Sequence, residues 1–353
     1  MKATSLLIAS AIALLPLLST AQQHVWRVNN NPALVQGPGS DPCDHCFTNL
    51  QDAENDPFVE PGDTLHLEPS PVSYGDIELD KRLVIIGPGY RLGQGTTNNA
   101  GLQANNGVAM IHGVTFNTNS DGSKLTGVVI GDGSLYGGIA IGSVNNITLD
   151  RNFHWARSIS FNGSGINYFT ITRCYFEGAG ITTPLYDQVV SNVVIANNYF
   201  NGSISTDETF SNVTITNNLF NWNGMHSPWG AEVKNNIFVL GSMAVNNNVI
   251  HHNAAAGASS LPAGFNNLNG VVFTSVFNPA FTSDDQKWRL SSNYLTYMNL
   301  VGDDNTVPGM FGGNTPYQPS GVPAIPAVYQ MTAPSTAIQG TPINVTIGTR
   351  SND

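Results

Sequence analysis

The chain has little charge, and most of it is acidic. Only 10% of its 353 residues are charged, 13 Lys and Arg against 24 Asp and Glu, which gives a formal net charge of -11. Proteins that bind nucleic-acid phosphates present Lys and Arg over a broad surface, so we do not expect nucleic acid as a partner. Because 41% of the residues are hydrophobic, the chain can still bury a core and fold as a globular protein.

Long apolar runs are absent beyond the N-terminus. There, Lys2 precedes an apolar run from Leu6 to Leu18, and Ser19-Thr20-Ala21 places small residues before a cut at Gln22. This pattern predicts a secretory signal peptide over residues 1–21. An uncleaved anchor helix is the alternative, but the run is shorter than the ~20 residues that span a bilayer. We therefore expect a mature protein without a membrane span that is secreted, periplasmic or held at the cell surface.

Cysteine is scarce, with Cys43 and Cys46 in a CxxC pair and Cys174 alone. An oxidising compartment favours a local disulfide between Cys43 and Cys46. A redox-active pair and a metal site are the alternatives. Neither has further support, because no βαβ pattern surrounds the pair and no second pair of zinc ligands is evident.

Turn-forming residues are abundant instead. The sequence contains 36 Gly, 20 Pro and 41 Asn, which together make up more than a quarter of the chain and are spread along it. Such a composition predicts frequent turns and short helices.

A strand-like motif recurs six times in the middle of the chain. The central apolar residues of successive copies lie 22, 24, 20, 18 and 12 residues apart, and all but the last interval suit one coil of a solenoid. Within each copy, large apolar residues alternate with small or polar ones, which predicts a short strand with one buried face. The central residues are Leu149, Ile171, Ile195, Ile215, Val233 and Val245.

Each copy ends in an Asn-rich pair whose second position predicts an amide ladder. Identical side chains in stacked coils lie ~4.8 Å apart, close enough to hydrogen bond, and Asn tolerates the left-handed backbone of a sharp corner. Cys174 occupies this position in its own copy, which predicts a buried corner residue and not a nucleophile. The predicted ladder consists of Asn152, Asn198, Asn218, Asn236 and Asn248.

These repeats, together with segments 47–53, 61–67, 83–89, 123–130 and 285–313, resemble secreted bacterial proteins of the pectate-lyase-like superfamily. The resemblance implies an all-β, right-handed parallel β-helix. We expect one domain over residues 22–315, including an N-terminal cap, and a proline-rich linker with one or two short strands over residues 316–353.

The resemblance also implies a carbohydrate context, in which two functions are open. The protein binds extracellular polysaccharide or serves as a surface or matrix component, or it degrades polysaccharide as a lyase or glycosidase. The first is favoured because few ionisable residues lie on the predicted solvent face of the main strand. No cofactor is evident, and no stacked acidic groups support a Ca²⁺ site.

The best candidates for chemistry are Arg151 and Arg173, which should stack at the same corner of adjacent coils. Stacked cations favour an anionic ligand, so this pair predicts binding of an acidic polysaccharide and, in an enzyme, supplies the catalytic base. Asp150, His154 and Glu177 flank the pair as candidate binding residues. A surface salt-bridge patch is the alternative interpretation.

A second candidate surface carries Trp222, His226 and Trp229, which follow the strands. Exposed Trp rings stack on sugars, although Trp also closes loops over a core. His251 and His252 follow the last repeat, but the sequence shows no third ligand for a metal there, and we predict no metal site.

Overall fold

The computed structural model describes residues 23–33, 46–93, 99, 101–131, 137–182, 189–205, 210–222, 224–226, 230–240, 242–243, 248–257, 261–292, 294 and 301–352. The predicted signal peptide, Cys43, Trp229 and Val245 lie outside these residues. Cys46 is disulfide-bonded. Because Cys43 lies outside the described residues, the pairing of Cys46 with Cys43 stays a prediction. No helix in the described part of the chain is long and apolar enough to cross a membrane.

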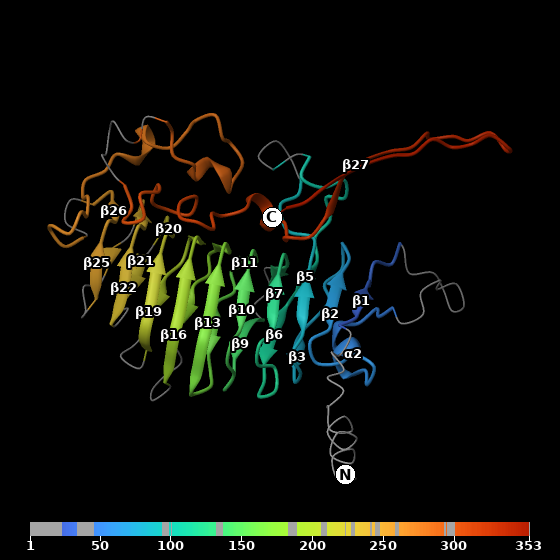
Figure 1. Ribbon diagram of the computed structural model, residues 1–353, viewed down its shortest axis with the longest axis horizontal. Coiled ribbons are helices and arrows are strands. Elements are labelled where there is room, and N and C mark those ends of the chain that lie inside the picture. The colour runs from blue at the N-terminus through green and yellow to red at the C-terminus, as the bar shows by residue number, and fades with distance from the viewer. Residues whose placement is uncertain are drawn as a thin grey trace, which may run out of the picture.

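The chain forms a parallel β-solenoid, in which successive coils place their strands side by side (Figure 1). The predicted all-β architecture of stacked parallel strands is confirmed. The largest sheet has ten strands: β1(Val25–Val28), β2(Thr64–Leu67), β4(Val84–Ile86), β7(Lys124–Thr126), β10(Thr148–Asp150), β13(Ile166–Thr172), β16(Val190–Ala196), β19(Phe210–Thr216), β22(Ala231–Lys234) and β25(Val249–His251).

Two further sheets of eight strands complete the coils. The second sheet, which follows the first around each coil, contains β5(Met110–Ile111), β8(Val129–Ile130), β11(Phe153–Trp155), β14(Tyr175–Glu177), β17(Tyr199–Phe200), β20(Leu219–Phe220), β23(Ile237–Phe238) and β26(Ala254–Ala255). The third sheet contains β3(Ile77–Leu79), β6(Gly113–Phe116), β9(Gly138–Ile141), β12(Ile159–Phe161), β15(Ile181–Thr182), β18(Ile204–Ser205), β21(Gly224–His226) and β24(Ser242–Met243).

Strand register in the first sheet follows the predicted repeat for five of its six copies. Their central residues pair in sequence order from Leu149 to Val233, and all are buried. The prediction for the sixth copy is wrong, because the residue that pairs with Val233 is Ile250 and not Val245. The run Asn246-Asn247-Asn248 imitates a corner pair, whereas the register of Ile250 gives an interval of 17 residues, close to those of the earlier coils.

The corner after each of these strands combines a left-handed residue with a ladder position, which holds Asn everywhere except after Arg173, where it holds Cys174. The left-handed residues have φ between 54° and 58°; they are Arg151, Arg173, Asn197, Asn217, Asn235 and His252. The next residue forms the predicted ladder, in which each amide Nδ2 of Asn198, Asn218 and Asn236 donates to the Oδ1 one coil further along at 3.0 Å.

Asn253, and not Asn248, continues the ladder. The Asn248 side chain instead accepts from the Ala231 backbone N–H at 2.8 Å. Cys174 is a buried corner residue, as predicted: its backbone N–H donates to Asn198 Oδ1 at 2.8 Å. Burial raises the pKa of its thiol well above the ordinary value, which makes it a poor nucleophile.

An aromatic column fills the interior behind the second sheet. The rings of His154, Phe176, Phe200, Phe220 and Phe238 stack with centroids 4.2, 4.6, 5.2 and 4.8 Å apart. At the N-terminal end, helix α2(Leu50–Asn55) buries Leu50 and Ala53 in the same core. Segment 47–53 therefore contributes to the N-terminal end of the core.

The chain beyond β26 turns back and covers the outer face of the second sheet (Figure 1). It includes the short 3-10 helices η1(Phe273–Ser275), η2(Gln286–Trp288) and η3(Pro319–Gly321). Phe273, Met310 and Tyr317 pack with outward-facing residues such as Tyr175 and Tyr199 to form a second apolar cluster. This returning segment, which we call the cover, thus closes a face of the solenoid.

The last two strands, β27(Ala327–Thr332) and β28(Thr346–Arg350), form an antiparallel hairpin. This hairpin projects away from the coils (Figure 1). Both strands lie within residues 316–353, for which the sequence predicts one or two short strands.

Candidate functional site

Arg151 and Arg173 occupy the same corner of adjacent coils, as predicted, but they do not form an exposed cationic pair. The Arg151 side chain is only 3% exposed, and its Nη1 donates to the Val322 carbonyl at 2.7 Å. Asp150, also buried, accepts from Arg173 Nε at 2.8 Å and lies 3.5 Å from Arg151 Nε. The returning C-terminal chain therefore covers this corner, and one carboxylate interacts with both guanidinium groups.

This geometry corrects the expectation that both arginines point into solvent. Arg151 cannot reach an external polymer without displacing the segment around Val322. The sequence could not show this, because the covering residue lies 171 positions further along the chain. The Asp150–Arg151–Arg173 cluster is positioned to anchor the C-terminal cover.

His154 is a core residue, which corrects its expected place at a binding surface. It pairs with Phe176 across the strands and is fully buried in the aromatic column. Burial lowers its pKa to about 3, so the imidazole is neutral at physiological pH. It has no access to a ligand.

Glu177 lies apart from the arginine pair and interacts with Arg91. Arg91 Nη2 is 3.5 Å from Glu177, and its Nη1 is 2.7 Å from Asp284. The same guanidinium lies over the rings of Phe153 and Tyr175 at 5.0 and 4.7 Å. Glu177 therefore fixes the cover to the second sheet, a role for which its sequence neighbours gave no signal.

Trp222 is the predicted aromatic residue that the structure places at an open surface. Its side chain is 55% exposed and lines a cavity of about 500 Å³. His226 lies in β21 beside Ser205 of β18, so it belongs to the same sheet as this cavity. Small polar residues form the remainder of the lining, namely Ser158, Gly178, Ala179, Gly180, Thr182, Asn201, Gly202 and Ser203.

A second cavity of about 420 Å³ continues across the outer face of the third sheet. The two share Ser158, and Ser160 in one lies 3.2 Å from Thr182 in the other, Oγ to Oγ1. We call this continuous surface the polar groove. Its second half is lined by Asp76, Ile77, Glu78, Gly113, Val114, Thr115, Gly137, Gly138, Ile139, Ala140, Ser158, Ser160 and Asn162.

The polar groove is recessed because the side chains that line it are small. A Cβ atom on Gly180 would collide with the Ser203 carbonyl, and one on Gly202 would collide with the Ala179 carbonyl. These glycines let the coils pack closely and leave hydroxyl and backbone groups at the surface. The sequence showed the small residues, but only the fold shows that they line one face.

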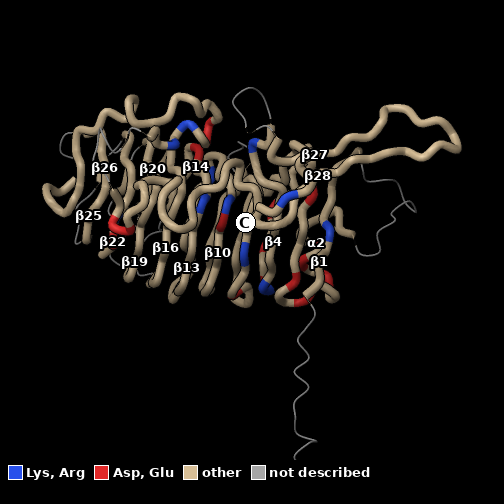
Figure 2. Tube along the Cα trace, turned by 45° about the horizontal axis from the view of Figure 1, so that its top comes forward, with Lys and Arg blue, Asp and Glu red and all other residues tan. Residues whose placement is uncertain are grey.

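The electrostatics of the polar groove are neutral to acidic. The described residues that line it include Asp76 and Glu78 but no Lys or Arg. Charged residues are sparse along the whole solenoid, which Figure 2 shows as a mostly uncharged tube. Hydroxyls, amides and one exposed indole ring suit a ligand rich in hydroxyl groups.

An ionisable cluster that the sequence did not reveal lies on the first sheet. Glu232, His251 and Asp303 each place a potential ligand atom within 4.8 Å of the others. Thus His251 has the additional ligands that its sequence neighbourhood lacked. However, Lys234 Nζ lies 3.3 Å from Glu232 and 2.9 Å from Asp303, so the protein supplies its own cation between the carboxylates.

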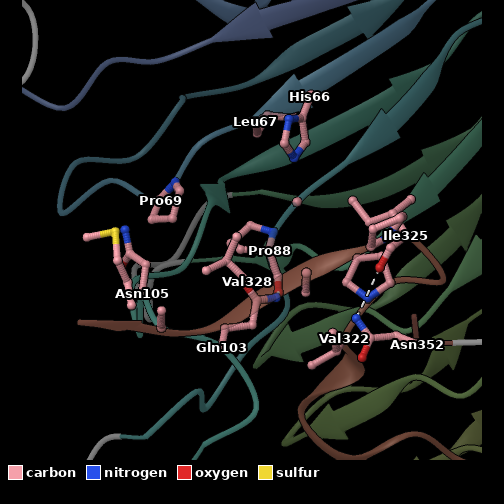
Figure 3. Close-up of a pocket in the computed structure, with 16 residues that line it drawn as sticks. His66, Leu67, Pro69, Pro88, Gln103, Asn105, Val322, Ile325, Val328 and Asn352 are labelled. Atoms are coloured by element: carbon pink, nitrogen blue, oxygen red, sulfur yellow. Dashed lines mark hydrogen bonds between the residues drawn. The ribbon is translucent and has the colours of Figure 1, made fainter. Parts of the chain in front are cut away.

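A cavity of about 510 Å³ lies at the base of the C-terminal hairpin (Figure 3). Its lining is largely apolar, with Leu67, Val322, Ile325 and Val328 among the residues around it. His66 is the titratable residue in this lining, and burial lowers the pKa of its imidazole. The cavity holds no grouping of acids or nucleophiles in its lining.

Comparison with protein-family models, curated proteins and solved structures finds no match to this chain. Function is therefore inferred from the geometry of the described surfaces.

Proposed function

We propose that this protein is an exported β-solenoid, similar to the pectate-lyase-like superfamily, that binds extracellular polysaccharide along the polar groove. The observation that carries the proposal is the exposed Trp222 ring at one end of a groove lined by hydroxyls, amides and backbone. An indole ring stacks on the apolar face of a sugar, while hydroxyl and amide groups exchange hydrogen bonds with its edges.

Charge favours a neutral polysaccharide over an acidic one. The groove lining has two carboxylates and no cation, and the arginine pair that suggested an acidic ligand is largely covered. An anionic polymer would be repelled by Asp76 and Glu78 and would gain no ion pair. Binding should therefore respond weakly to salt.

The test is affinity electrophoresis or calorimetry of the secreted protein with neutral and uronic-acid polysaccharides. Trp222→Ala should weaken binding at least tenfold, about 1.4 kcal/mol, with the fold unchanged. Phe58→Ala is the matched control, because Phe58 is also an exposed aromatic residue, at 65%, but lies near the N-terminal end of the solenoid. Full binding by Trp222→Ala, or binding of uronic-acid polymers alone, would contradict the proposal.

Polysaccharide degradation is the second candidate function, and the Glu232–Asp303 cluster favours it. Paired carboxylates about 5 Å apart catalyse glycoside hydrolysis in retaining enzymes, and Glu232 and Asp303 place oxygens within 4.8 Å of each other, with Lys234 Nζ within 3.3 Å of both. Release of reducing ends by the protein, and its loss in Glu232→Gln, would establish this activity. Unsaturated-uronate absorbance would instead indicate a lyase.

A further inference from the structure

The hairpin of β27 and β28 has an apolar face that no other part of the described chain covers. Met331 and Ile347 pair directly across the two strands and are 65% and 57% exposed. Ile343 and Val345, in the segment that leads into β28, are also exposed apolar side chains. The opposite face is polar, with Thr332 paired to Thr346.

This apolar face is continuous with the cavity at the base of the hairpin. Val328 and Met331 belong to β27 and also line the cavity, together with Pro323 and Ile325 (Figure 3). The base is fixed to the solenoid, because Arg350 Nη2 donates to the Leu102 carbonyl at 2.6 Å. Surface and cavity therefore form one continuous apolar tract.

An isolated hairpin of this kind is poorly protected. Two-stranded hairpins are marginally stable in water, and natural edge strands usually carry charges that prevent pairing with other chains. Between residues 327 and 350 the only charged side chain is Arg350, at the base. Figure 2 shows the projecting part of the hairpin without Lys, Arg, Asp or Glu.

We propose that this tract is the interface between two copies of the chain. The hairpins pack apolar face to apolar face and antiparallel about a twofold axis, and Ile338 at the tip of each enters the cavity at the base of the other. Ile338 is the most exposed large apolar side chain described, at 77%. A twofold interface requires such self-complementarity, with a projection and its receptor on the same chain.

Size and charge both favour a second copy as the occupant. Segment 327–350 together with the rest of the cavity lining comprises 37 residues, more than the ~20–30 residues on each side of a standard protein interface, so the tract is large enough to form one. Two bodies of net charge -11 repel each other, and the neutral projecting hairpin lets them associate at a distance from most of that charge. This proposal does not depend on the polysaccharide proposal.

The first test is sedimentation equilibrium of the full secreted chain. The wild-type protein should be a dimer, and Ile347→Asp should raise the dissociation constant at least tenfold. Thr346→Asp is the matched control, since it adds the same charge one residue away on the polar face. Ile338→Asp and Gln339→Asp form the corresponding pair at the tip. Circular dichroism should show an unchanged solenoid in all four variants.

The second test fixes the orientation of the hairpins. The double variant Val328→Cys with Ile338→Cys should form disulfide-linked dimers through one residue of each kind, identified by peptide mapping. Linkage of Ile338→Cys to itself would overturn the antiparallel arrangement. A wild-type monomer at all concentrations, or equal weakening by Ile347→Asp and Thr346→Asp, would overturn the interface. A monomer whose hairpin binds neutral lipid vesicles would assign the tract to a membrane surface instead.

Discussion

At the scale of single residues, His154 shows how burial decides the role of a titratable group. The sequence places it beside the arginine pair as a candidate binding residue. In the structure His154 faces the core, while its neighbour Phe153 faces outward and is covered by the returning chain. Both side chains are therefore buried. The imidazole serves as a flat ring between coils, stacked on Phe176 at 4.2 Å.

The first prediction concerns the pH dependence of stability. The folded-state pKa of His154 is about 3, below the ordinary value of 6.5. Between these values the unfolded chain binds a proton that the folded chain excludes, so stability falls as pH is lowered from about 6.5 toward 3. His154→Phe should remove up to about 1.4 kcal/mol per pH unit of this dependence.

Urea unfolding at pH 8, 6 and 5 measures the effect. The variant and the wild type should differ most at pH 5 and least at pH 8. Phe200→His, two coils further along the column, should add a similar acid sensitivity. Identical pH profiles for His154→Phe and the wild type would show that the imidazole is accessible to protons in the folded state.

At the scale of strands, alternation of apolar and polar residues was enough to predict which side chains face inward. Ile195 is buried and Val194 is 37% exposed, although both are aliphatic. Ile195→Asp places an unpaired carboxylate among Ile171 and Ile215, at a cost of several kcal/mol. We expect it to abolish soluble expression, whereas Val194→Asp should fold.

Soluble yield and circular dichroism of the two variants check this prediction. Val194 is the matched control because it is the exposed neighbour of Ile195; Ala196, on the other side of Ile195, is buried. If both variants fold equally well, the inward face of the first sheet has been assigned wrongly.

Local repetition explains what the sequence could predict about the fold. The strands around Leu149, Ile171, Ile195 and Ile215 have a regular spacing, and the ladder positions follow from it. The last coil broke the pattern because Asn248 and Asn253 have the same chemistry, and only the spacing distinguishes them. In the candidate site, Trp222 was predictable as an aromatic at a strand end, but the polar groove depends on small residues from many coils.

At the scale of the whole molecule, the sequence could not predict the contacts between segments that lie far apart in the chain. Arg151 is covered by Val322, Glu232 meets Asp303, and Tyr90 shares a 2.6 Å hydrogen bond with Tyr317 across 227 residues. No local pattern encodes such pairings, because the cover lacks the repeat of the coils.

The last prediction tests how the cover is held. Asp285 is fully buried and accepts from Asn99 Nδ2, the Ser320 backbone N–H and the Tyr317 hydroxyl at 2.8, 2.7 and 3.2 Å. Asp285→Ala leaves these donors without their acceptor and should lower the free energy of unfolding by about 2–3 kcal/mol. Asp284→Ala, which removes a partly exposed carboxylate next to it, should cost under about 1 kcal/mol.

Denaturant titration with limited proteolysis distinguishes the two. Asp285→Ala should expose cleavage sites in residues 301–323 before the coils unfold. Equal midpoints for the two variants would mean that the buried carboxylate does not hold the cover in place.

The sulfur of Cys174 divides the amide ladder into unequal parts. Beyond it, Asn198, Asn218, Asn236, Asn253 and Asn267 form an unbroken series of side-chain hydrogen bonds. Before it, the Asn152 side chain bonds only to backbone, the Leu125 carbonyl and the Val128 N–H, and the Asn152 backbone N–H donates to the Cys174 sulfur at 3.5 Å where later coils offer an amide oxygen. Sulfur is a weak acceptor, and coils of a solenoid gain stability chiefly from their neighbours. Fraying should thus be directional: the coil of Cys174 is a weak seam, at which the N-terminal coils separate from the more cooperative C-terminal block.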